Sequence, residues 1–214
     1  PRAWIDLNRS RTEIDPDRVA GRDATQTPHI SKKVRGGLGI VPRRLHGAGN
    51  LWREKWQHRH IIDRIDKDHE PYHLMVAHLL EQIRSAHGSA LLLDLHSMPP
   101  VQDENRRQIG FVIGDRFGRS CESRYAELAG IHFRLQGHHV QTNHPYSGGY
   151  ILERHGEPAR NIHAFQLEVD RALYLDEKLC EPVAVAQSIA DMIRNCCLML
   201  AEQLTGRDQL EAAE

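Results

Sequence analysis

"LLLDLHSMPP", residues 91–100, is the stretch that decides the fold. Its first five residues are almost all apolar, a pattern typical of a strand buried on both faces at the centre of a largely parallel sheet. The strand then reaches His96 and meets two prolines, which cannot continue a strand ladder. In open α/β sheets, ligands bind beyond the carboxyl ends of the strands, so His96 is a candidate functional residue.

Other strand and helix patterns alternate along the chain. Apolar runs or apolar/polar alternation predict strands over the segments 4–8, 110–114, 139–142 and 163–171. Helical patterns cover the segments 51–65, 71–87, 123–130 and 181–204, where Pro71 and Pro182 suit a first helical turn and Gly88 a helix end. This alternation predicts a three-layer α/β/α sandwich around a mixed, largely parallel sheet.

The composition limits the classes of partner. The chain has 28 Lys plus Arg against 29 Asp plus Glu, so no overall field attracts a nucleic acid or a membrane surface. No apolar run reaches the length of a membrane span and no secretory leader opens the chain, so we expect a cytoplasmic protein. The four cysteines lack C-x-x-C spacing and are expected to be free thiols. With no linker composition, residues 1–214 are expected to form a single domain.

Two residues at strand positions could carry chemistry. His96 can ligate zinc or act as a general base, and equally can be a histidine that is hydrogen-bonded at a strand end. Glu168 lies between apolar residues, a costly place for a carboxylate unless it faces a cleft, a cation or a metal. In a cleft it can take a proton from water and deliver it to a leaving amine. The alternative is a salt bridge with Arg171 or with another cation.

Two further segments suit substrate binding. Arg9 follows Asn8 at the end of the first expected strand, where its guanidinium can hold a carboxylate bidentately or lie on the surface as an ordinary arginine. Tyr146 lies in the glycine-rich loop "NHPYSGGY", residues 143–150, where a phenol can hydrogen-bond substrate or pack beside a flexible turn. The residues themselves leave both alternatives open.

Taken in order, "DLNR", "PYH", "LLLDLHSMPP", "GFVIGDRFGRSC", "NHPYSGGY" and "QLEVDRALY" resemble the N-formylglutamate amidohydrolase family, from residue 3 to about residue 200. That family is similar in turn to zinc carboxypeptidases. The resemblance implies a zinc-carboxypeptidase-like fold. It also implies hydrolysis of the formyl amide of N-formyl-L-glutamate, or of a closely related small N-acyl amino acid, as part of histidine degradation.

The resemblance also implies roles for single residues. His96 becomes a zinc ligand and Glu168 the proton shuttle. Asn8 and Arg9 hold a substrate carboxylate, and Asn143 and Tyr146 line the pocket. Candidates for the substrate's side-chain carboxylate are basic residues in two places: Arg35, Arg43, Arg44 and Arg171.

The zinc site is where this sequence departs from the family pattern. The other ligands that the resemblance implies, a histidine and an acidic residue, would precede "DLNR", so about 60 residues are expected N-terminal to Pro1. His29, in "TPHIS", is a poorly matched substitute ligand. The alternative is a metal-free, non-catalytic relative that binds carboxylates through Asn8 and Arg9.

Overall fold

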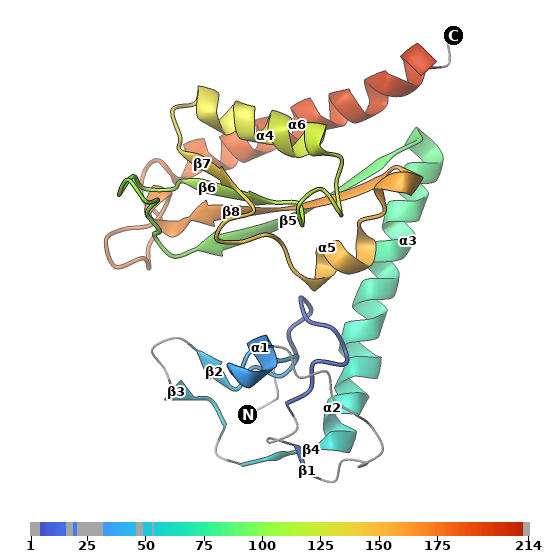
Figure 1. The fold of residues 1–214 in the computed structure, drawn as a ribbon, viewed down its shortest axis with the longest axis vertical. Helices are drawn as coiled ribbons and strands as arrows, with labels where there is room; N and C mark the ends of the chain where they lie inside the picture. The colour runs from blue at the N-terminus through green and yellow to red at the C-terminus, as the bar shows by residue number, and fades with distance from the viewer. Residues whose placement is uncertain (1–4, 16–18, 21–31, 46–48, 53, 212–214) are drawn as a thin grey trace. The chain divides into compact units, whose positions relative to one another are not determined.

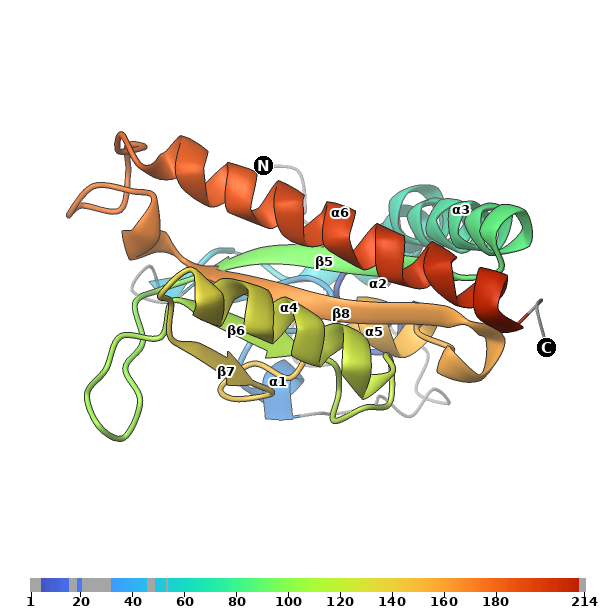
Figure 2. The ribbon, with the colours of Figure 1, turned by 90° about the horizontal axis from the view of Figure 1, so that it is seen from above.

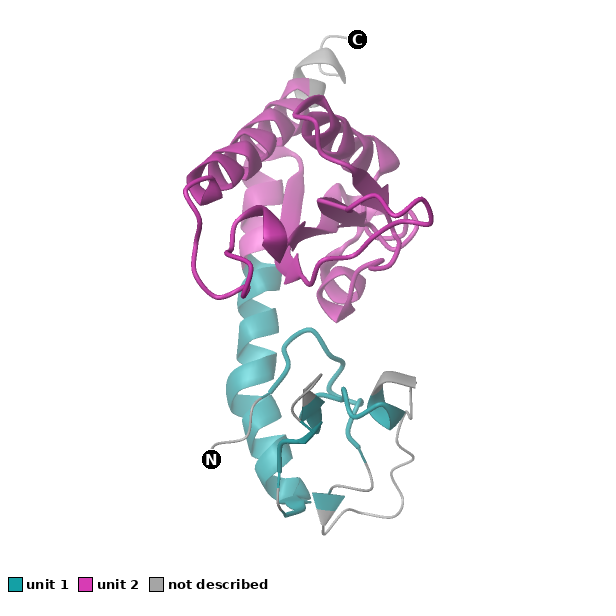
Figure 3. Ribbon diagram, turned by 90° about the vertical axis from the view of Figure 1, so that its left-hand side faces the viewer, with its two compact units in different colours: residues 1–78 teal, residues 79–214 magenta. Residues whose placement is uncertain are grey.

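The computed structural model of this chain describes residues 5–15, 19–20, 32–45, 49–52 and 54–211. Internal contacts divide the chain into two compact units, residues 1–78 and residues 79–214 (Figure 3). The single domain expected for residues 1–214 stays a prediction. Within the described residues, no helix combines the length and the apolar character that crossing a bilayer requires.

The second unit is built on a four-stranded sheet with the order β5-β8-β6-β7. The strands are β5 (Ala90–Met98), β6 (Phe111–Gly114), β7 (Val140–Thr142) and β8 (Ile162–Asp170). β5 pairs parallel to β8 and β6 parallel to β7, whereas β6 pairs antiparallel to β8. The predicted mixed, largely parallel sheet is therefore confirmed.

Helices cover both faces of this sheet. α4 (Ser123–Leu135) and α6 (Ala186–Glu211) lie on one face, and α5 (Tyr150–His155) lies on the other (Figures 1 and 2). Phe165, Leu167 and Val169 of β8 join side chains of α4 and α6 in the main hydrophobic core. On the α5 side, Ile151 and Leu152 pack against apolar side chains of β5 and β8. These contacts make the three layers that the sequence predicts.

Two expectations for this unit are wrong. β5 is an edge strand among the described residues, since β8 is its one strand partner there, and its Leu95 is 54% exposed. An apolar run reports a tendency to be buried, but not how many strands lie beside it. The last helix begins at Ala186 rather than residue 181, because the Val183 backbone N–H donates to the Tyr174 carbonyl at 3.0 Å, outside any helix.

The first unit has short strands and one long helical stretch. Its two-residue strands are β1 (Val19–Ala20), β2 (Arg44–Leu45), β3 (Gly49–Asn50) and β4 (Trp56–Gln57), and α1 spans Lys32–Arg35. α2 (His58–Arg64) passes through a π-helical turn, Ile65–His69, into α3 (Glu70–His87). A small core gathers the buried side chains Val19, Ile40, Ile61 and Ile65.

This helical stretch differs from the prediction. No break separates two helices, and Pro71 lies one residue after the start of α3 instead of opening a separate helix. Proline has no N–H to donate, so the helical hydrogen-bond ladder must change near it, and the π turn ends just before Pro71. The predicted end is confirmed: Gly88 adopts φ +79° and donates its N–H to the Arg84 carbonyl at 2.7 Å.

The strand expected over residues 4–8 is also wrong for its described part. Residues 6–9 form a turn, in which the Asn8 backbone N–H donates to Asp6 Oδ1 at 2.9 Å. An aspartate side chain that bonds the backbone two residues on offers the chain an alternative to a strand ladder. Trp4 and His29 lie outside the described residues.

Candidate active site

The register of β5 and β8 brings the two predicted catalytic positions together. His96 pairs with Glu168, and Asp94 pairs with Gln166. Side chains alternate along a strand, and Leu167 and Val169 face the core under α4 and α6. His96, Glu168 and their alternate neighbours therefore share the opposite face of the sheet, the one on which α5 lies (Figure 1).

Glu168 has the environment of a general base. It is buried, with 6% of its surface exposed, and its Oε1 accepts a hydrogen bond from Gln166 Nε2 at 2.6 Å. Burial raises the pKa of Glu168; the nearby Asp94 charge adds to the rise, while His96 and the Gln166 hydrogen bond oppose it. A carboxylate with a raised pKa accepts a proton more readily near neutral pH than an ordinary glutamate.

Asp94 lies on the same face of β5 as His96, as the alternation along the strand predicts, and is a further polar residue of this site. Its Oδ1 lies 3.0 Å from His96 Nε2, so the carboxylate orients the imidazole. Its other oxygen, Oδ2, is buried and has no hydrogen-bond partner in the described part of the chain.

Tyr146 lies beside this pair of strands. Its ring packs against Met98, Ile109 and Val112. Burial raises the pKa of the Tyr146 phenol, the Glu168 charge raises it further, and the Arg171 charge lowers it. Tyr146 is therefore both packed and within electrostatic reach of the predicted base, so its two sequence alternatives are compatible.

The loop that carries Tyr146 approaches the sheet closely. A Cβ atom on Gly114 would lie 2.7 Å from the Gly148 nitrogen and 2.9 Å from the Tyr146 carbonyl oxygen. Only a residue without a side chain leaves room there for the loop backbone. Gly114 thus sets the distance between the Tyr146 loop and β6.

Asn143 has a structural use in the same loop. Its Oδ1 accepts hydrogen bonds from the backbone N–H groups of Asp115 and Phe117, and its Nδ2 donates to Asp115 Oδ1 at 2.7 Å. The side-chain amide therefore holds the turn that follows β6. Its contact with substrate stays a prediction.

The salt bridge considered for Glu168 is absent. Arg171 donates from Nε to the Met98 carbonyl at 3.4 Å, and no ion pair joins it to Glu168 within the described residues. Asp170, the residue between them on the same strand end, accepts hydrogen bonds from Gln108 Nε2 and from the Ala172 backbone. Glu168 is therefore buried by packing and not by pairing with Arg171.

Asn8 and Arg9 belong to the first unit, in the turn described above. The Arg9 side chain is 17% exposed, and its Nε lies 3.5 Å from Asp6 Oδ2. Arg9 is thus mostly buried and paired, unlike an ordinary surface arginine. The Asn8–Arg9 turn, residues 6–9, presents one guanidinium and one amide on the same short segment.

Two buried histidines that sequence reasoning missed hold this turn. His69 Nε2 lies 2.8 Å from the Arg9 carbonyl oxygen, and His73 Nε2 lies 3.0 Å from the Leu7 carbonyl oxygen. Both side chains are fully buried, and their rings lie 4.4 Å apart. His73 is the histidine of the "PYH" motif, whose spacing to the turn no local pattern reveals.

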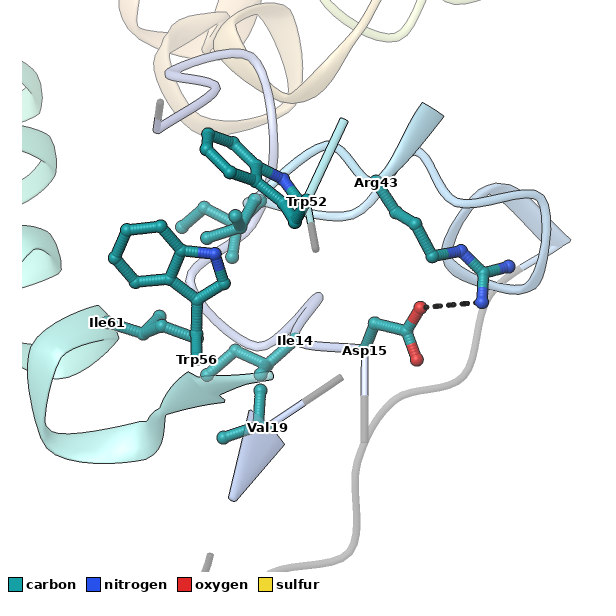
Figure 4. Close-up of a pocket in the computed structure, with 9 residues that line it drawn as sticks. Ile14, Asp15, Val19, Arg43, Trp52, Trp56 and Ile61 are labelled. Carbon is teal, nitrogen blue, oxygen red and sulfur yellow. Dashed lines mark ion pairs between the residues drawn. The ribbon is translucent and has the colours of Figure 1, made fainter. Parts of the chain in front are cut away.

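The basic residues of the first unit have partners of their own. Arg43 Nη1 lies 3.6 Å from Asp15 Oδ2, beside a cavity of about 20 Å³ that Trp52 and Trp56 also line (Figure 4). A cavity of this size admits no more than a water molecule. Arg44 Nε donates to Asn50 Oδ1, and Arg35 accepts from Arg43 through its backbone carbonyl. A substrate role for these three arginines stays a prediction.

The described residues do not by themselves fit a catalytic zinc ion. They contain no group of three His, Cys, Asp or Glu side chains placed to hold a metal. Catalytic zinc has three protein ligands. His96 offers one imidazole and Asp94 one buried oxygen without a hydrogen-bond partner, which is less than this set requires.

The four cysteines are free thiols, as the sequence predicts.

Known proteins resemble this chain in sequence and in fold. Two curated relatives are N-formylglutamate deformylases, one from Pseudomonas aeruginosa (32% identity over 63% of this chain and 51% of the relative) and one from Pseudomonas putida (34% identity over 56% and 45%). The chain thus spans about half the length of the curated relatives it matches.

Solved structures agree with these relatives. A crystal structure of N-formylglutamate amidohydrolase from Ralstonia eutropha matches 95% of this chain and 75% of its own, with a TM-score of 0.84 and 29% identity. A protein from Agrobacterium tumefaciens, 18% identical with a TM-score of 0.53, shares the fold alone. The model of the N-formylglutamate amidohydrolase family matches residues 1–175. This chain therefore belongs to the N-formylglutamate amidohydrolase family.

Proposed function

We propose that this protein hydrolyses the formyl amide of N-formyl-L-glutamate and releases formate and L-glutamate. The observation that carries the proposal is Glu168, a buried carboxylate with a raised pKa that lies in register with His96 on neighbouring parallel strands. Perturbed carboxyl groups of this kind are typical of general bases. Membership of the family supports the amide as substrate.

Glu168 acts as the proton shuttle in this proposal. Its carboxylate takes one proton from a water molecule, whose oxygen forms a bond to the formyl carbon. The C–N bond then breaks, and the same proton passes from Glu168 to the leaving nitrogen, which becomes the amine of glutamate. Gln166, which donates to Oε1, and the surrounding burial keep the carboxyl group oriented for both transfers.

Asn8 and Arg9 bind one substrate carboxylate in this proposal. A guanidinium presents two parallel N–H donors to a carboxylate, and the Asn8 amide adds a third. The buried histidines beneath the turn fix the backbone from which both side chains project. Tyr146 and Asn143 line the pocket in the same proposal.

We also propose zinc as the cofactor, with His96 as one ligand and the remaining ligands from residues N-terminal to Pro1. When bound, zinc supplies a Lewis acid for the carbonyl and lowers the pKa of its water. Metal analysis of the purified full-length protein tests this proposal. A metal-free protein that binds N-formylglutamate without turnover would favour the non-catalytic alternative.

Formate release from N-formyl-L-glutamate tests the activity. The full-length protein should release formate, and Glu168→Gln should lower kcat by about 10²–10⁴-fold while keeping substrate affinity. Glu202→Gln, on the exposed side of α6, should behave as wild type. Wild-type protein that releases formate from no N-formyl amino acid would overturn the proposed function. Equal turnover by Glu168→Gln would overturn the role of Glu168.

A further inference from the structure

We propose that Arg171 binds the side-chain carboxylate of the substrate and so selects an acidic amino acid. This inference rests on the proposed function and deepens it, because it assigns the second of the two carboxylates of N-formylglutamate. Arg171 begins the short helical turn that follows β8 directly, three residues after Glu168.

Arg171 lies at the carboxyl edge of the strands that carry the candidate base. Met98 is the last residue of β5 and pairs with Asp170, the last residue of β8. The bond from Arg171 Nε to the Met98 carbonyl therefore ties the guanidinium to the ends of both strands. Ligands of open α/β sheets bind at this edge.

The charge of Arg171 is not neutralised by a neighbouring carboxylate. Nη1 and Nη2 form no hydrogen bond or ion pair with any described residue, and the side chain is half-buried. Three of the four other half-buried arginines described in this unit lie within ion-pair distance of a glutamate, namely Arg84, Arg116 and Arg124. The fourth, Arg154, donates to the Tyr150 hydroxyl at 3.0 Å. A half-buried cation without a counter-charge is suited to an anionic ligand.

The nearest carboxylate in sequence does not fill this role. Asp170 is fully buried, and its two oxygens accept hydrogen bonds from Gln108 and Ala172. Those contacts fix Asp170 beneath the strand end and keep it from pairing with Arg171. The substrate's side-chain carboxylate can then approach the two Nη groups end-on and bidentately.

The Tyr146 phenol shows that Arg171 and the candidate base act on one region. The charges of Glu168 and Arg171 shift the pKa of Tyr146 in opposite directions. The two groups, which carry opposite charges, therefore both lie within electrostatic reach of the tyrosine. A substrate whose formyl amide lies at Glu168 has its side chain only a few bonds away, a span that an arginine side chain can bridge.

Substrate preference tests the proposal. Formate release is measured for wild type, Arg171→Gln and Arg171→Lys with N-formyl-L-glutamate and with its neutral isostere N-formyl-L-glutamine. Losing the partner of a desolvated carboxylate should lower kcat/KM for N-formylglutamate about a hundredfold in Arg171→Gln. Turnover of N-formylglutamine should stay within about threefold, and Arg171→Lys should fall between. Arg134→Gln, an exposed arginine of α4, is the matched control.

The outcomes separate the two proposals. If wild type releases no formate from any N-formyl substrate, the proposed function fails and the role of Arg171 fails with it. If wild type is active but Arg171→Gln lowers kcat/KM equally for both substrates, Arg171 is a structural tether of Met98 and the specificity role is overturned. An unchanged kcat/KM for N-formylglutamate in Arg171→Gln overturns it as well. Thermal melting of each variant separates loss of fold from loss of specificity.

Discussion

The strand-end site in residues 79–211 and the Asn8–Arg9 turn are held in place by different kinds of contact. His96 and Glu168 are aligned by the backbone ladder of β5 and β8, which pairs every residue from Ala90↔Ile162 to Met98↔Asp170. The turn has no ladder. Its backbone is held by the side chains of His69, His73 and Asp6. One backbone hydrogen bond, from the Asp6 N–H to the Ile40 carbonyl at 2.8 Å, adds to these contacts.

Because of this difference, a substitution in the strand-end site can lower activity without lowering stability. In the Asn8–Arg9 turn, a substitution should lower both. A ladder of backbone hydrogen bonds survives the exchange of a polar side chain on its open face. A turn whose carbonyls are bound by buried side chains loses position when one donor is removed. Substitutions in the two regions should therefore differ in kind as well as in size.

The largest effect is expected for Glu168→Gln. Removing a general base lowers kcat by about 10²–10⁴-fold. Stability should move the other way, because the folded-state pKa of Glu168 is raised, so ionising this group as pH rises destabilises the native state. Glutamine removes that penalty and still accepts from Gln166. Kinetics and denaturant unfolding at pH 5 and pH 8 check this.

A Glu168→Gln variant that unfolds more easily at pH 8 than wild type would contradict the separation of chemistry from stability. The wild-type rate should also fall as pH drops through the raised pKa of Glu168, since the protonated acid cannot take a proton from water. The Glu202→Gln variant serves as the control for both measurements.

Gly114→Ala should have the next largest effect, because the sheet site depends on backbone spacing. A Cβ atom there would lie 2.7 Å from the Gly148 nitrogen and from the Ser147 carbonyl carbon, so the Tyr146 loop must move. Overpacking of this kind costs about 3 kcal/mol. Urea unfolding and kcat/KM measure it, and Gly206→Ala, with open space around its Cβ position, is the matched control. Equal stability of the Gly114→Ala protein would contradict the expected role of the loop.

The comparison also explains what the sequence could predict. Alternation along "QLEVDR" and "LLLDLHS" places Glu168 and His96 on strand faces, because side-chain direction in a strand is a local property. The same alternation places Asp94 on the strand face of His96. The sheet order and the exposure of Leu95 depend on which strands are neighbours. An apolar run in the sequence does not predict those neighbours.

The Asn8–Arg9 turn shows why the rest could not be predicted. Asp6, Leu7 and Asn8 alternate as a strand would, but one side-chain hydrogen bond turns the chain. The histidines that fix the turn lie some 60 residues along the sequence. Long-range pairing of this kind leaves no local pattern in the sequence.

His73→Leu tests the dependence of the turn on its distant donors. Leaving the half-buried Leu7 carbonyl without the His73 donor should cost about 2 kcal/mol of unfolding free energy. KM for N-formylglutamate should rise about tenfold with a smaller change in kcat, because the turn positions a binding group and not the base. His73→Gln keeps an N–H donor, so its KM should stay close to the wild-type value. An unchanged KM in His73→Leu would show that the turn keeps its geometry without this donor.

The smallest effect is expected for a buried histidine on the sheet side of the comparison. Burial lowers the pKa of His155 to about 4, with Arg154 lowering it further and Glu157 opposing, whereas its unfolded-state pKa is about 6.5. The unfolded chain therefore binds more protons between these values, and stability falls as pH drops through this window. The loss from pH 7 to pH 5.5 should be about 1 kcal/mol, and His155→Gln should remove it. Urea unfolding at both pH values measures the slope, with His144→Gln, an exposed histidine, as control. An equal slope in His155→Gln would mean that the acid sensitivity of this unit arises from groups other than His155.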